Sequence, residues 1–427
     1  MRKAHRVGWL LTIAAAILFA LARPDCVEAK TLHQWVQLGP DGASARAITD
    51  DAACPTLVVD GTSLPMATRA DPKQVFKNVP AAVFAVRSCE RVVPAGAIAA
   101  TIDGAALPLP RANPRRILVF GDTGCRLKEG DPVQDCNDAD GWPFPRLAKA
   151  AAASRPDLVI HVGDYHYRET ACPPDHAGCK DSPFGYGWDA WEADFFKPAA
   201  PLLAAAPWIM TRGNHEDVAR AGEGWSRLLD YGQATGDCAD LTGVYLARLG
   251  DFGVIVVDGA NAPDPKGDAG GLAAKLAAQF APIAAQVPAE AWLTTHRPFN
   301  AMRGAKGQLK VENSVLQQAL GPLLPAGVSM IVSGHIHFFQ AVDFGGARPA
   351  QLVAGTGGDN LEPMVPKPVA GATINGATAL HAATRSGFGY MVWDRSGAGA
   401  WSGVVFDDRG KPIDRCRLDR RALTCGG

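Results

Sequence analysis

The chain has 427 residues, of which 42 are Lys or Arg and 43 are Asp or Glu, so its formal net charge is −1. This balance, without a basic stripe, argues against a nucleic-acid scaffold role, because such binding depends on clustered positive charge. The length is sufficient for a large catalytic domain and a smaller second domain.

The N-terminal segment has the pattern of a signal peptide. Basic residues among the first six positions precede an apolar run from Val7 to Ala22, which is typical of a cleaved leader rather than a membrane span. We predict a signal peptide over residues 1–29, with cleavage after Ala22 or Ala29. No later apolar stretch is long enough to cross a bilayer, so we expect a periplasmic or secreted protein without membrane contact after signal removal.

Residues 30–112 show short alternating apolar runs that are separated by Gly and Pro turns, with no helical period. This pattern predicts a small N-terminal β domain. The segment 112–116 (ANPRR) reads as a linker, and we expect the catalytic domain to occupy residues 113–427.

In the catalytic part, strand-like runs alternate with helical patterns. Helices are expected over residues 144–153, 188–196 and 272–286. Residues 244–259 predict a hairpin with a Gly-Asp turn. The strands that follow residue 350 are expected to close a second sheet, and the Gly-rich loop 354–385 is expected to border the active site.

The ten cysteines lie outside the motifs described below, and most form close pairs in the sequence. An exported chain makes disulfides the default state of such pairs. We therefore predict the bridges Cys54–Cys89, Cys125–Cys136, Cys172–Cys179 and Cys416–Cys425. Cys238 is left over, with Cys26 as its partner only if the signal peptide is cleaved before residue 26.

Five short segments each end an apolar run of strand length with a residue that binds metals. They are ILVFGDTG (117–124), DLVIHVGDYHYRE (157–169), PWIMTRGNHE (207–216), AWLTTHRPF (291–299) and VSMIVSGHIHFF (328–339). Each run is closed by Gly or a polar turn. The carboxyl ends of parallel strands converge on one crevice in an α/β fold, so these separate segments are expected to build one site.

The side chains that these segments offer carry only oxygen and nitrogen donors: Asp122, Asp164, Tyr167, Asn214, His215, His296, His335 and His337. Without a thiolate, the set suits hard or borderline divalent and trivalent ions. The three-residue spacing between Asp164 and Tyr167 predicts one helical turn after the strand. An extended chain would place His335 and His337 on one face, with Ile336 opposite.

In this order, the motifs GDTG, GDYHY, GNHE, TTHRPF and GHIH resemble those of the calcineurin-like metallophosphoesterases. The first motif lacks the histidine of DxH, and the second contains Tyr167 as GDxxY, which resembles the purple-acid-phosphatase branch. The resemblance covers residues 113 to 345 firmly. It implies an α/β (α+β) four-layer sandwich, in which two mixed β-sheets pack face to face with helices outside.

The resemblance also implies two metal ions per chain. The first would be bound by Asp122, Tyr167 and His337, the second by Asn214, His296 and His335, and both by Asp164. A free phenol has a pKa near ~10, so a tyrosinate ligand at neutral pH points to Fe3+ in the first position. The second ion is expected to be Fe2+, Zn2+ or Mn2+.

Substrate contacts are expected next to these ligands. His215, directly after Asn214, is the predicted catalytic residue, which stabilises phosphoryl charge or protonates the leaving group. Plant and animal relatives carry extra histidines after the fourth motif, whereas this chain has Arg297, Arg303 and Lys306, which could anchor phosphate. His166 is a further candidate substrate contact.

These features predict a dinuclear metal-dependent hydrolase of phosphate esters, most simply an acid-phosphatase-like enzyme for phosphomonoesters of small molecules. A phosphodiesterase or nucleotide pyrophosphatase would use the same metals and differ in the walls of the pocket. From another class, a catalytically inactive binding protein could retain the metals for structure, but the presence of His215 beside the ligands argues against it. The sequence does not predict the oligomeric state.

Overall fold

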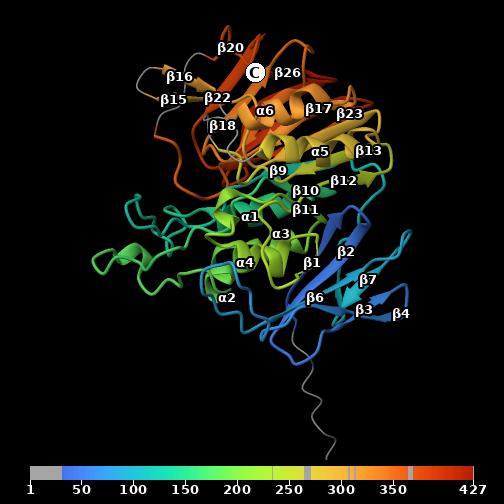
Figure 1. Cartoon of the computed structure of the whole chain (residues 1–427), viewed down its shortest axis with the longest axis vertical. Coiled ribbons are helices and arrows are strands. Elements are labelled where there is room, and N and C mark those ends of the chain that lie inside the picture. Colours follow the sequence, from blue (N-terminus) through green and yellow to red (C-terminus); the bar gives the residue numbers. More distant parts are fainter. Residues whose placement is uncertain are drawn as a thin grey trace, which may run out of the picture.

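A computed structural model describes residues 31–232, 234–263, 271–305, 308–311, 314–363 and 369–426. The predicted signal peptide, Cys26 and Lys306 lie outside these residues. An eleven-stranded sheet and a seven-stranded sheet dominate the described part of the chain (Figure 1).

Three parallel strands form the centre of the first sheet: β9 (Arg116–Phe120), β10 (Leu158–His161) and β11 (Trp208–Met210). Their apolar residues are almost all buried, as expected for parallel strands covered on both faces. The antiparallel strands on the side of β9 are β23 (Gly389–Gly397), β24 (Ala400–Asp407), β25 (Pro412–Asp419) and β26 (Ala422–Cys425).

The prediction that the C-terminal strands close a second sheet is therefore wrong for these four. Strand β23 pairs with β9, with Met391 opposite Val119, so the C-terminal strands extend the first sheet. The pairing buries Trp393 between the two sheets, and this burial of an aromatic side chain favours the observed arrangement.

The second sheet follows the order of its strands in space. They are β12 (Val244–Leu249), β13 (Phe252–Val257), β14 (Glu290–Thr295), β17 (Val328–Ser333), β19 (Ala350–Ala354), β18 (Phe339–Asp343) and β22 (His381–Arg385). Strands β12 and β13 form the predicted hairpin. Gly250 in its turn has a φ of 68°, a conformation that glycine adopts without steric cost.

The two sheets pack face to face through one apolar core, to which Ile117 and Ile160 contribute from the first sheet and Val254, Trp292 and Val332 from the second. On the outer face of the first sheet lie the helices α1 (Phe144–Ala153), α2 (Trp188–Trp191) and α3 (Lys197–Leu203), together with a π-helical turn at Glu192–Phe196. On the outer face of the second sheet lie α5 (Leu272–Ala284) and α6 (Ser314–Leu320).

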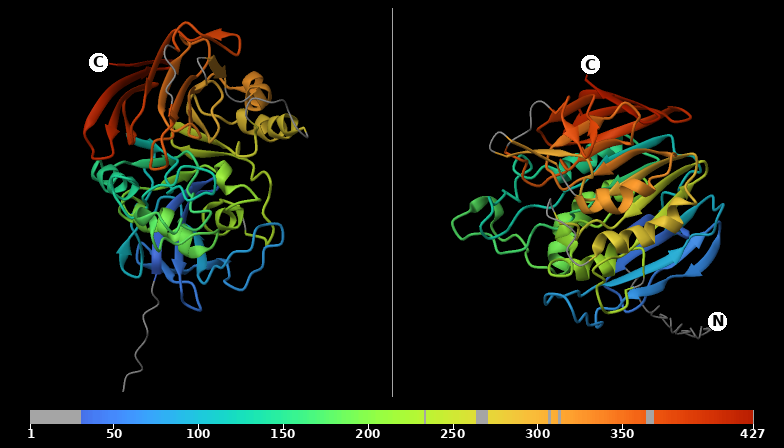
Figure 2. Two further views of the ribbon diagram at one scale, coloured as in Figure 1. Left: turned by 90° about the vertical axis from the view of Figure 1, so that its left-hand side faces the viewer. Right: turned by 45° about the horizontal axis from the view of Figure 1, so that its top comes forward.

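The predicted four-layer sandwich is thus confirmed, and the three predicted helical segments are helical. Figure 2 shows α1 to α3, in green, in the half of the molecule that contains the N-terminal strands, and α5 and α6 in the half that contains the C-terminal strands. The shortest described helix is α4 (Gly222–Gly224), and small hairpins are formed by β15 (Met302–Ala305) with β16 (Gln308–Val311) and by β20 (Thr373–Ile374) with β21 (Ala377–Thr378).

Residues 31–112 form strands and no helix. Four of them continue the first sheet: β1 (Thr31–Gly39), β2 (Gly42–Thr49), β6 (Arg87–Val92) and β5 (Ala67–Ala70). The others form a separate sheet that packs against them: β3 (Thr56–Val59), β4 (Thr62–Pro65), β7 (Ala100–Ile102) and β8 (Ala105–Ala106). Strand β1 runs parallel to β11, with Gln37 opposite Trp208. A domain boundary near residue 112 stays a prediction, since hydrogen bonding between strands continues across it.

All four predicted disulfides are present: Cys54–Cys89, Cys125–Cys136, Cys172–Cys179 and Cys416–Cys425. Cys238 is a buried free thiol. Among the described residues, the helices are all too short or too polar to cross a bilayer.

Candidate metal centre

The five motif segments bring their polar residues together at the carboxyl ends of strands from both sheets. Asp122 follows β9, Asp164 follows β10, Asn214 follows β11, His296 follows β14, and both His335 and His337 follow β17. Each of these strands is anchored in the core by buried apolar residues, so the loops that carry the donors start from fixed points.

One group of donors surrounds the hydroxyl of Tyr167. Its Oη lies 2.8 Å from Asp164 Oδ2, 3.4 Å from Asp122 Oδ1 and 3.2 Å from His337 Nε2. His337 Nε2 is also 3.2 Å from Asp122 Oδ1. The four residues that were predicted to hold the first metal ion therefore converge on one point.

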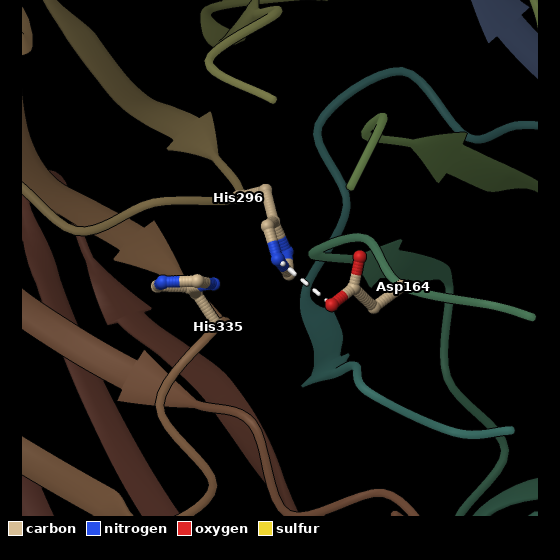
Figure 3. Close-up of side chains that lie close together, drawn as sticks. All are labelled: Asp164, His296 and His335. Atoms are coloured by element: carbon tan, nitrogen blue, oxygen red, sulfur yellow. Dashed lines mark ion pairs between the residues drawn. The ribbon is translucent and has the colours of Figure 1, made fainter. Parts of the chain in front are cut away.

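A second group adjoins the first through Asp164. His296 Nε2 lies 3.1 Å from Asn214 Oδ1 and 3.1 Å from Asp164 Oδ2. The ligand atoms of Asp164, His296 and His335 all lie within 4.8 Å of one another. Figure 3 shows the two imidazoles and the carboxylate facing a common space, with the ion pair between His296 and Asp164 marked. Asp164 belongs to both groups, as a shared carboxylate must.

The backbone takes an unusual conformation at three of these residues. Asp122, Asp164 and His335 have φ values of 59°, 57° and 70°, in the left-handed region that costs about 1–2 kcal/mol for a residue with a Cβ atom. Such strain persists where the surrounding structure imposes it and is concentrated at functional sites.

These conformations correct two local predictions. No helical turn joins Asp164 to Tyr167, because the left-handed Asp164 redirects the chain and Arg168 next to Tyr167 bridges to Leu127 instead. The segment from His335 is bent rather than extended, although Ile336 does pack away from the donors in a small apolar cluster.

Two buried carboxylates hold the loops that carry the donors. Glu216 accepts hydrogen bonds from the backbone N–H groups of Gly213, Asp164, Tyr165 and His166 at 2.8–3.1 Å. Asp194, in the π-helical turn, accepts from the N–H groups of Cys125, Tyr167 and Arg168 and from Arg168 Nε. Sequence reasoning missed Asp194, because it lies within a helical pattern far from any motif.

The electrostatics of the site suit bound cations. Burial alone would raise the pKa of the Asp164 carboxyl, but His296 and His215 outweigh it and hold that pKa well below its usual range. Burial lowers the pKa of His296, but Asp164 outweighs it and raises the pKa to about 9. Burial, Asp164 and Asp122 raise the pKa of the Tyr167 phenol well above its ordinary value. Buried carboxylates, imidazoles, an amide and a phenol in two groups fit two hard or borderline cations.

His215 lies beside the donors and is fixed from behind. Its backbone N–H donates to Asp164 Oδ1 at 2.9 Å, and its ring centroid lies 3.8 Å from that of Tyr167. Nδ1 lies 3.2 Å from Glu169 Oε1, and Arg220 binds the same carboxylate. Burial lowers the pKa of His215 to about 3, which favours a neutral ring held by Glu169. Glu169 and Arg220 carry no motif and were missed in the sequence.

A cavity of about 390 Å³ opens onto the donors. The site residues that line it are Asp164, Tyr167, Asn214, His215, His335 and His337, and its other walls are Arg126, Asp131, Pro132, Arg303 and residues 360–363. The last of these segments belongs to the Gly-rich loop that was predicted to border the site, so that prediction is confirmed.

The candidate substrate residues differ in their positions. Arg303 lines the cavity, and its Nη2 donates to Glu362 Oε1 at 2.7 Å. Arg297 is half-buried beside His335, with its Nη1 3.0 Å from His335 Nε2. His166 is fully buried, packs near the rings of Tyr186 and Trp191 and is not among the cavity-lining residues. Lys306 lies outside the described residues.

Comparison with known proteins agrees with this geometry. Residues 115–339 match the model of the calcineurin-like phosphoesterase family. Among solved structures, purple acid phosphatase PPD1 from seeds of yellow lupin (Lupinus luteus) is similar, with a TM-score of 0.60 and 13% identity over 91% of this chain and 74% of that one. PhoD is similar with a TM-score of 0.55 and 11% identity, over 95% of this chain and 94% of that one.

No curated protein matches the sequence. At 13% and 11% identity the structural likeness shows the fold alone, but the family match spans more than half of the chain. The chain belongs to the calcineurin-like phosphoesterase family and is a metal-dependent phosphoester hydrolase with a fold that implies a dinuclear metal site.

Proposed function

We propose that the protein is an acid-phosphatase-like phosphomonoesterase that acts on phosphorylated small molecules. The observation that carries the proposal is the position of Asp164, which belongs to both donor groups at the floor of a 390 Å³ cavity. A cavity of this size accepts a small ligand and buries little of a macromolecule.

Asp122, Tyr167 and His337 would hold one metal ion, Asn214, His296 and His335 would hold the other, and Asp164 would contact both. When bound, two such ions supply Lewis acidity for phosphoryl transfer to water. His215 lines the cavity with its ring supported by Glu169. From there it can donate a hydrogen bond to a phosphoryl or leaving-group oxygen.

A substrate panel tests the proposal. We expect p-nitrophenyl phosphate to be hydrolysed with a higher kcat/KM than bis-p-nitrophenyl phosphate or nucleoside diphosphates, at each of several pH values. A preference for the diester or the diphosphate would support the alternative, a phosphodiesterase or nucleotide pyrophosphatase on the same metals. A fully metallated protein without activity on any of the three would favour a binding protein.

Iron in the first position is expected to colour the protein. The raised pKa of Tyr167 means that its phenol gives up a proton only to a strong Lewis acid, and Fe3+ is such an ion. Tyr167→Phe should therefore abolish visible charge-transfer absorption, as measured by spectroscopy with elemental analysis of the same sample. An active, fully metallated and colourless protein that contains zinc alone would contradict the assignment.

Arg303 is the described basic residue of the predicted phosphate clamp that lines the cavity. Arg303→Ala should lower kcat/KM for monoesters by about 10- to 100-fold, the effect of losing a hydrogen bond to a charged group. A diester carries one charge fewer, so its loss should be smaller, and part of the monoester loss should appear in KM.

The matched variant for this test is Glu362→Gln, which releases Arg303 from its ion pair without removing the guanidinium. Arg297→Ala and Lys306→Ala complete the series. If all of these variants leave the monoester-to-diester ratio unchanged, the basic segment is not the phosphate clamp.

We further propose export to the periplasm or the medium, with residues 1–29 as the signal peptide, 30–112 as an N-terminal β domain and 113–427 as the catalytic domain. The four disulfides support an oxidising location. N-terminal sequencing of the mature protein after cell fractionation tests it. An intact Met1 in a cytoplasmic fraction would exclude it.

A further inference from the structure

We propose that Arg126 and Asp359 form a positioning pair for the metal ligand His337. Neither residue belongs to a motif, and they come from distant loops that meet beside the cavity. The inference rests on the proposed metal-dependent function and adds to it the means by which one of the two metal positions is fixed.

Asp359 lies directly behind His337. The carboxylate is fully buried, and its Oδ2 lies 3.3 Å from His337 Nδ1. The same Nδ1 lies 2.6 Å from the carbonyl oxygen of Asn360. Two acceptors at Nδ1 require the proton to be on that atom, so Nε2, which faces Asp122 and Tyr167, is left as the ligand atom.

Arg126 compensates the charge of Asp359. Its Nε donates to the two oxygens of Asp359 at 3.0 and 3.1 Å, Nη2 donates to Oδ2, and Nη1 donates to Asp131 at 2.7 Å. A buried carboxylate without such a partner would be costly. The Arg126 guanidinium carbon also lies 4.8 Å from the ring centroid of Tyr167, a distance at which a cation stabilises an electron-rich ring.

One guanidinium therefore acts on two ligands of the same metal position, His337 through Asp359 and Tyr167 through its ring. The other donor group is held differently: His296 Nδ1 lies 2.8 Å from the carbonyl oxygen of Val162. The pair should consequently affect the first metal position and leave the second unchanged.

The loop that carries Arg126 is closed by the disulfide Cys125–Cys136. Within it, the backbone N–H of Arg126 donates to Gln134 Oε1 at 2.8 Å, and Gln134 Nε2 donates to the carbonyl oxygen of Gly358 at 2.9 Å. Asn360 Nδ2 donates to the carbonyl oxygen of Pro132 at 2.6 Å. These bonds dock the loop onto the segment that contains Asp359, so the guanidinium reaches the carboxylate from a fixed backbone.

The test measures Zn2+ affinity of the full chain by competition with a chelator in two backgrounds. Asn214→Ala weakens the second position and leaves the first to be titrated, whereas His337→Ala does the reverse. In the Asn214→Ala background, Asp359→Asn and Arg126→Gln should each weaken Zn2+ binding by about 10- to 100-fold, as is typical when the partner of a metal-ligating histidine is removed. Arg126→Lys should restore part of the affinity.

In the His337→Ala background, the same substitutions should change the affinity by less than about twofold, because the ligand they position is already absent. The matched control is Arg146→Gln, which breaks ion pairs of another arginine with Asp140 and Asp408 away from the cavity. Should a single variant fail to fold, the double variant Arg126→Gln with Asp359→Asn removes both charges together and leaves no unpaired buried ion. It is expected to bind Zn2+ as weakly as Asp359→Asn.

Unchanged affinity of Asp359→Asn and of the double variant in the Asn214→Ala background would overturn the inference. Equal losses in both backgrounds would also overturn it, since that result describes a general structural role. A wild-type chain that binds fewer than two metal ions refutes the proposed function and the inference with it, whereas two bound ions with an insensitive Asp359 variant refute the inference alone.

Discussion

Replacement of Asp164 by alanine is expected to empty both metal positions and to abolish phosphoester hydrolysis. Its carboxylate lies 2.8 Å from Tyr167 Oη and 3.1 Å from His296 Nε2, so it is the anion that both donor groups share. Two cations held close together repel each other strongly where water is excluded, and without this carboxylate nothing between them offsets the repulsion. Elemental analysis and steady-state kinetics on the same preparation measure both effects.

Asp164→Asn is the matched variant for this prediction. Asparagine has nearly the same shape and tolerates the left-handed backbone at this position, where φ is 57°, so it removes the charge without added strain. It should lose metal almost as fully as alanine. His337→Ala should lower occupancy mainly in the first position and His335→Ala mainly in the second, and equal loss of both metals in both histidine variants would contradict the assignment of ligands.

His215→Ala is expected to lower kcat by about 10²–10⁴, the range for removal of a positioned acid or charge stabiliser, while both metals remain bound. The ring lines the cavity, and its contact with Asp164 is made by the backbone N–H, which alanine retains. The loss should be largest for substrates with poor leaving groups, because these depend most on protonation of the departing oxygen.

His381→Ala serves as the control for His215, because this histidine is exposed on β22, outside the site. Its activity and metal content should equal those of the wild type. Full turnover of the His215 variant at full metal occupancy would show that the ring takes no part in the reaction.

The donors of the site could be predicted from the sequence because each one follows a strand whose apolar run is visible locally. Asp122, Asp164 and His296 follow parallel strands, and parallel strands bring their carboxyl ends to one edge. The left-handed conformations at Asp122 and Asp164 could not be predicted, because they depend on hydrogen bonds from distant loops, such as the contact of the Asp164 N–H with Glu216.

The supporting residues were missed for a related reason. Asp194, Glu169 and Asp359 each act through contacts with residues that are distant in the sequence or that follow a turn, and a buried carboxylate looks like any surface acid in a sequence. The assignment of β23 to the first sheet failed likewise, because the alternation of a strand shows which face is buried but not which strand is its neighbour.

The continuation of the first sheet through β1 has a consequence for any truncated form of the protein. Without residues 31–112, strand β11 would present a row of unpaired N–H and C=O groups, which is a template for strand addition by another molecule. In the intact chain, the outermost strands of this sheet are β5 and β26, each of four residues. Short outer strands of this kind limit aggregation. The N-terminal strands thus protect the metal-bearing part against self-association, independently of any part they take in substrate binding.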